Sequence, residues 1–139
     1  MTIPFDGYHN AQAYEVEYEV LYKRTMKVRA LDIEHAWWEG KAYFDKQNKI
    51  TGAELYAYCH TLAQKYGWEF GGEIGGHLIG HFPHERLEKE DKTNYIHPDN
   101  TIDMRALDQK GEERNWILEI HFVDKKKEIG GFFEQLLTL

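Results

Sequence analysis

A chain of 139 residues with 42% hydrophobic and 29% charged residues has the composition of a soluble globular protein, long enough to bury one core in a single domain over residues 1–139. The net charge of −7, without a concentrated basic stripe, excludes a nucleic-acid-binding class. One cysteine excludes an intrachain disulfide, and the chain shows neither a long apolar span nor a signal-peptide pattern, so we expect a cytoplasmic protein without membrane partners.

The first half of the chain predicts one strand and two helices. Apolar and acidic residues alternate from Tyr14 to Val20, which is the period of a strand with one apolar face. From about Thr25 to Lys46, apolar residues recur at helical spacing. The inward face of this helix is expected to carry Val28, Leu31, Ala36, Trp38 and Ala42. A second helix begins with the capping-box sequence at 51–54 and ends at Gly67.

The second half of the chain predicts a glycine-rich connection, a long excursion (an irregular loop) and two strands. Glycines at positions 71, 72, 75, 76 and 80 indicate close backbone approach of the kind found around a site. Residues 85–114 are polar and are expected to form the excursion. The strands are expected at 115–124 and 131–137, joined by a lysine-rich turn.

Three histidines, His77, His81 and His84, lie close together among glycines and apolar residues. Imidazole is the commonest nitrogen ligand of divalent metals and can also transfer protons near pH 7. The alternative is that these histidines are hydrogen-bonded groups in a turn. The segment is therefore a candidate for either a metal site or a structural turn.

Two carboxylates stand in apolar strands, Glu119 in the first closing strand and Glu134 in the second. Alternation places Glu119 and His121 on one strand face, and burying a carboxylate there is costly unless it is paired or bound to a cation. A buried Arg or Lys could pair with each glutamate, but the two strands contain neither residue. Two carboxylates and a histidine form an oxygen-and-nitrogen cage suited to Mn, Fe, Co or Zn.

These segments, in this order, resemble the C-terminal motifs of the pita-bread metallopeptidases, the family of methionine aminopeptidase, Xaa-Pro aminopeptidase and prolidase. In that family a Gly-His-x-x-Gly segment supplies a metal-binding histidine, and a histidine seven residues later contacts the substrate. A glutamate in an apolar strand and a glutamate in the last long strand complete this part of the site. His77, Glu119 and Glu134 match the metal ligands by motif, and His84 matches the catalytic histidine.

The resemblance implies an α+β fold, a truncated pita-bread domain whose curved antiparallel sheet carries helices on one face. It implies one or two divalent ions (Mn, Co, Fe or Zn), or none if the site is degenerate. His81 and His121 are expected to bind substrate, as is His97, although each is more often a surface residue or a support behind the ligands. Because most of the family's first half has no counterpart here, a homodimer is one expectation.

The family's site also needs two aspartates on a hairpin before the helices. One alignment puts Asp6 and Glu17 in these positions, whereas the other puts Ala11 in the second position and leaves no ligand. Two further departures are Ile120, where the family often has proline, and Gln135, where an acidic residue is usual.

Two functions follow from the resemblance. The first is a metal-dependent aminopeptidase of the Xaa-Pro class, which hydrolyses the N-terminal residue of a peptide. The second is a catalytically inactive homologue that binds a peptide or a protein through the same surface.

Overall fold

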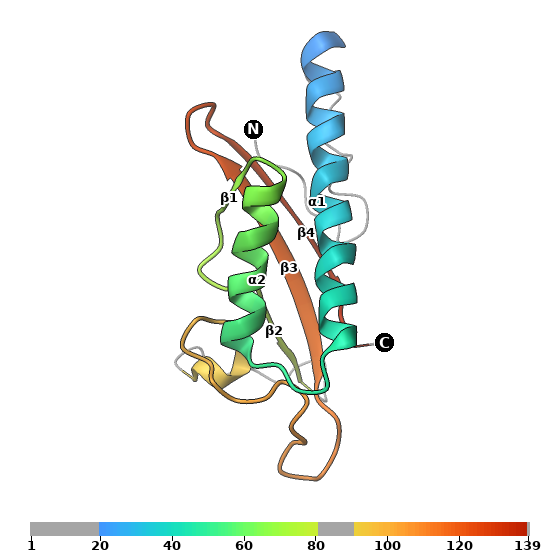
Figure 1. The fold of residues 1–139 in the computed structure, drawn as a ribbon, viewed down its shortest axis with the longest axis vertical. Coiled ribbons are helices and arrows are strands. Elements are labelled where there is room, and N and C mark those ends of the chain that lie inside the picture. Colours follow the sequence, from blue (N-terminus) through green and yellow to red (C-terminus); the bar gives the residue numbers. More distant parts are fainter. Residues whose placement is uncertain (1–19, 81–90, 139) are drawn as a thin grey trace.

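The computed structural model of the protein describes residues 20–80 and 91–138, and Figure 1 shows how they are arranged. The helices and strands are α1 (Val20–Lys46), α2 (Gly52–Lys65), β1 (Glu69–Phe70), β2 (Gly76–Ile79), the 3-10 helix η3 (Lys92–Asn94), β3 (Asn115–Asp124) and β4 (Ile129–Leu136). The strand pairs are antiparallel. The α+β class with an antiparallel sheet, expected from the sequence, is confirmed.

β3 is the central strand of the sheet. β1 pairs with its C-terminal part and β2 with its N-terminal part along one edge, whereas β4 follows the opposite edge. Alternate residues of β3 are fully buried, namely Trp116, Leu118, Ile120 and Phe122. The two helices lie over this buried face (Figure 1), so the other face of the sheet is left to carry a site.

α1 is longer than the sequence indicated, and it turns a different face to the core. The helix begins at Val20, which therefore does not end a strand. Of the residues expected on the inward face, Ala36 is buried, but Leu31 and Trp38 are 38% and 51% exposed and Ala42 is also exposed. Among residues 31–46 the buried ones are Ile33, Ala36, Trp37, Gly40 and Phe44, whereas Val28 lies outside the residues whose side chains the structure describes.

The expected buried face of α1 was wrong because Trp37 and Trp38 are adjacent and equally apolar. The sequence alone does not show which of them faces the core, and packing against the sheet decides it. Trp37 is 1% exposed, and its indole Nε1 donates a hydrogen bond of 2.8 Å to the carbonyl oxygen of Leu118 in β3. The helix is thereby fixed on the central strand. Neither helix in the described part of the chain is long and apolar enough to cross a membrane.

α2 has the caps that the sequence predicted. The hydroxyl of Thr51 accepts a hydrogen bond from the backbone N–H of Glu54, and the Glu54 carboxylate accepts one from the N–H of Thr51. The helix ends at Lys65, and Gly67 follows in the left-handed region at a φ of 80°. Leu55, Cys59, Leu62 and Ala63 are buried against the core at helical spacing.

The described part of the expected excursion, residues 91–114, is anchored to the core. Ile96 and Met104 are 0% and 1% exposed. The amide of Asn100, which is 1% exposed, donates to the Tyr95 carbonyl and accepts from the Ile102 N–H. The segment therefore contains little regular structure, as expected, but it packs beside the start of α2, where the Ala53 N–H donates to the Asn100 carbonyl.

Candidate metal centre

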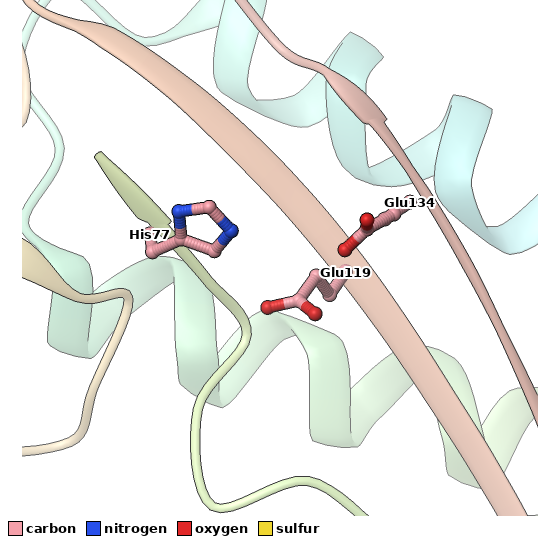
Figure 2. Close-up of side chains that lie close together, drawn as sticks. All are labelled: His77, Glu119 and Glu134. Atoms are coloured by element: carbon pink, nitrogen blue, oxygen red, sulfur yellow. The ribbon is translucent and has the colours of Figure 1, made fainter. Parts of the chain in front are cut away.

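Three side chains from three adjacent strands meet on the half-buried face of the sheet: His77 from β2, Glu119 from β3 and Glu134 from β4 (Figure 2). Each offers one donor atom, and these atoms lie within 4.8 Å of one another. The three residues that the sequence singled out as metal ligands are therefore brought together, although the first and the last lie 57 positions apart in the sequence (134 − 77).

Strand register accounts for this meeting. Glu119 lies directly opposite Glu134 in the β3–β4 pair. On the other edge of β3, His77 lies opposite Ile117, which is two residues from Glu119 and thus on the same face. A shift of one residue in either pairing would move a ligand to the helix-covered face.

Gly76 allows β2 to approach β3 closely enough to place His77. Its φ is 144°, and a Cβ atom added there would lie only 1.9 Å from the carbonyl oxygen of Ile117. No L-amino acid with a side chain fits this position without moving the backbone. The glycine before the histidine is thus a structural requirement of the site.

The tautomer of His77 suits metal binding. Its Nδ1 lies 2.9 Å from the carbonyl oxygen of Leu78, and because a carbonyl oxygen only accepts hydrogen bonds, Nδ1 carries the proton. The neutral ring then has its lone pair on Nε2. Figure 2 shows a ring nitrogen turned toward the two carboxylates. A hydrogen bond from the non-ligating nitrogen to a carbonyl is the usual support of a histidine ligand.

The two carboxyl groups perturb each other's ionisation. Burial and the facing Glu119 raise the pKa of Glu134 to about 7. Burial also tends to raise the pKa of Glu119, but the neighbouring His121 ring and the Glu134 carboxyl lower it by more. The pair therefore holds one shared proton near neutral pH, as expected for two acids that face each other with little solvent between them.

The donor set fits a divalent cation. The Oε2 atom of Glu119 is buried and has no hydrogen-bond partner, which is costly for a carboxylate unless a cation or the proton shared with Glu134 offsets its charge. Tetrahedral bonds of about 2.1 Å to Zn place the donors roughly 3.4 Å apart, so donor atoms that lie within 4.8 Å of one another would have to close by up to about 1.4 Å. One nitrogen and two carboxylate donors suit Mn, Fe, Co or Zn.

Two of the other histidines expected at the site lie in the described residues, and they differ in position. His121 lies beside the ligand group, with its Nε2 at 3.6 Å from Oε1 of Glu119. His97 instead supports a turn, because its Nδ1 accepts a hydrogen bond of 2.9 Å from the N–H of Asp99. The His97 side chain is only 16% exposed, and a role of His97 in substrate binding stays a prediction.

Four other residues named from the sequence lie outside the described residues: Asp6, Glu17, His81 and His84. Their roles stay predictions.

The sequence analysis did not identify the aromatic side chains that contact His121 beside the carboxylates. Phe132 lies opposite His121 in the β3–β4 pair and stacks on its ring at a centroid distance of 5.1 Å. Phe70 of β1 meets the same ring edge-on at 6.1 Å. The position of Phe132, two residues before Glu134 in a strand, places it on the site face and could have identified it. Nothing in the sequence indicated Phe70.

Comparisons of this chain with family models, with curated proteins and with solved structures give no match. The likeness to the pita-bread metallopeptidases accordingly stands on the residues quoted above.

Proposed function

We propose that this chain is a metal-dependent peptidase of the pita-bread kind that removes the N-terminal residue of peptides, with Xaa-Pro peptides as its substrate class. The observation that carries the proposal is the meeting of His77, Glu119 and Glu134 on one sheet face. A random set of a histidine and two glutamates would not be expected to match a family's motif order and also converge in space.

Each residue of the group has a chemical task in this proposal. Nε2 of His77 and the carboxylates of Glu119 and Glu134 hold the cation, which when bound acts as a Lewis acid and lowers the pKa of water. In the metal-free protein the carboxyl pair shares a proton near pH 7, and a cation held by both carboxylates would release it. His84 is proposed to contact the peptide, as its motif position implies.

The described residues favour one firmly held ion. They supply three donors in one group, and three protein ligands with an open position are typical of a catalytic centre. A second ion would need donors from Asp6 and Glu17, which the first alignment places in the family's aspartate positions.

Metal content is the test of this proposal. After reconstitution with Mn(II) or Co(II), the wild-type chain is expected to retain at least one ion, and His77→Ala, Glu119→Gln and Glu134→Gln are expected to lose it. His35→Ala is the matched control, since it removes an exposed imidazole of α1. Hydrolysis of Xaa-Pro peptides by the loaded protein is then expected.

The outcomes separate the two functions. Metal binding with cleavage supports the peptidase. Metal binding without cleavage, together with saturable peptide binding, would favour the non-catalytic binding module. A folded chain that binds no ion would rule out the metallopeptidase.

A further inference from the structure

His121 contacts one of the candidate ligands without belonging to the ligand group. Its Nε2 lies 3.6 Å from Oε1 of Glu119, whereas Oε2 of the same carboxylate is buried without a hydrogen-bond partner. The two oxygens of Glu119 thus have different surroundings. One faces an imidazole nitrogen and the other is available to a cation.

The ring of His121 is held in place by aromatic contacts on two sides. It stacks on Phe132 with an interplanar angle of 11° and meets Phe70 at 86°. Phe132 comes from β4 and Phe70 from β1, so the strands on both edges of β3 take part. The Nε2 atom is therefore directed at Glu119 by packing and does not depend on that contact for its position.

The glycine-rich connection leaves room for this ring. A Cβ atom at Gly72 would lie 2.9 Å from Cδ2 of His121. The connection is tied to α2, because the Tyr56 hydroxyl donates a hydrogen bond of 2.8 Å to the Gly72 carbonyl. A helix, a connection and two strands thus support one imidazole.

We propose that His121 is a positioning residue for Glu119: its Nε2–H holds Oε1 and directs Oε2 toward the cation shared with His77 and Glu134. The inference rests on the proposed metal site and adds the residue that orients its central ligand. A full hydrogen bond of about 2.9 Å requires the two atoms to approach by less than an ångström. Partners of this kind behind a ligand fix its orientation and its basicity.

The test compares two substitutions of His121, one that lacks an N–H donor and one that has it. His121→Phe keeps a ring that stacks on Phe132 but removes the donor, and His121→Gln restores an N–H donor. His60→Phe is the control, because the His60 ring of α2 also packs on Phe70, at a centroid distance of 5.1 Å. Co(II) affinity and the visible absorption of bound Co(II) are measured for each, with thermal unfolding to show that each variant is folded.

We expect His121→Phe to weaken Co(II) binding about 10- to 100-fold and to change the absorption spectrum. His121→Gln and His60→Phe should stay close to wild type in both. If His121→Phe binds Co(II) like the wild type, the positioning role is wrong while the metal site stands. If His121→Phe and His121→Gln lose affinity equally, an N–H donor at position 121 does not support the site, and the role is again wrong. If the wild type binds no Co(II), the proposed function fails and the inference fails with it.

Discussion

Glu119 and Glu134 face each other across the β3–β4 pair, and as two ionised carboxylates they would repel each other. The pKa of Glu134 rises from its ordinary value of 4.5 to about 7 for this reason and because of burial. The folded, metal-free protein therefore holds a proton between these pH values that the unfolded chain releases. Its stability falls as the pH rises through this window.

Glu134→Gln should remove this loss of stability at high pH. At pH 8 with a chelator, the variant is expected to melt several degrees above the wild type, since about 1 kcal/mol shifts the melting temperature of a domain of this size by roughly 4 °C. At pH 4.5, where Glu134 is protonated in the folded state and still half protonated in the unfolded chain, the difference in melting temperature should be much smaller. Differential scanning calorimetry at both pH values measures the effect.

Glu113→Gln serves as the control for this substitution, because Glu113 is exposed. It should leave the melting temperature unchanged at both pH values. An equal effect of Glu134→Gln at pH 4.5 and pH 8 would show that the facing carboxylates do not destabilise the metal-free protein.

At the scale of elements, α1 is fixed to β3 by Trp37. Trp37→Phe removes the hydrogen bond to the buried Leu118 carbonyl and leaves a smaller side chain, which should cost about 2–3 kcal/mol of unfolding free energy. Trp38→Phe changes a side chain that is 51% exposed and should cost less than about 0.5 kcal/mol. Urea denaturation measures both. A larger cost at Trp38 would mean that the helix turns the other tryptophan inward.

The position of β2 against β3 depends on a single residue, Gly76. Gly76→Ala places a Cβ atom 1.9 Å from the Ile117 carbonyl oxygen, so β2 should separate from β3 and carry His77 away from the carboxylates. We expect Co(II) affinity to fall at least tenfold, by analogy with the loss of a ligand's supporting contacts.

Gly111→Ala is the matched control for Gly76→Ala. Gly111 also has a positive φ, of 79°, but a Cβ atom there would meet nothing within 4 Å. It should cost about 1–2 kcal/mol of stability through backbone strain alone and leave Co(II) binding intact. Wild-type affinity in Gly76→Ala would show that His77 reaches the site without the close approach of β2.

At the scale of the whole molecule, the candidate site joins three strands that are otherwise held by hydrogen bonds and by the core beneath them. An ion bound only to the folded state at 100 times its dissociation constant should add about 2.7 kcal/mol to the unfolding free energy. Thermal unfolding with Co(II) at pH 8 should show this gain, and a chelator should reverse it.

His77→Ala should lose the gain, whereas His35→Ala, which changes an exposed residue of α1, should keep it. A gain of the same size in His77→Ala would place the stabilising ion elsewhere.

The homodimer expected from the sequence stays a prediction at this scale. Among the described strands, β4 pairs on one side only, which leaves an edge for such an association.

Local signals in the sequence predicted several elements well. The bounds of β3 were predicted as observed, because large apolar residues at every second position from Trp116 to Phe122 identify a strand with one buried face, and Glu119 and His121 stand on the other. The capping box and Gly67 marked the ends of α2, because these residues satisfy or redirect the backbone where a helix begins and ends. The orientation of α1 was not predictable in this way, since Trp37 and Trp38 are equally apolar.

The sequence by itself indicated three things: the α+β class, through its family resemblance, the residue types of a candidate metal site, and the strand face on which Glu119 and His121 lie. Only the tertiary structure decided which side chains meet, because strand register joins residues far apart in the chain. It also decided that His97 supports a turn and that His121 reaches Glu119. Spacing along a strand fixes the face of a side chain, but the neighbours across the sheet come from pairing and packing.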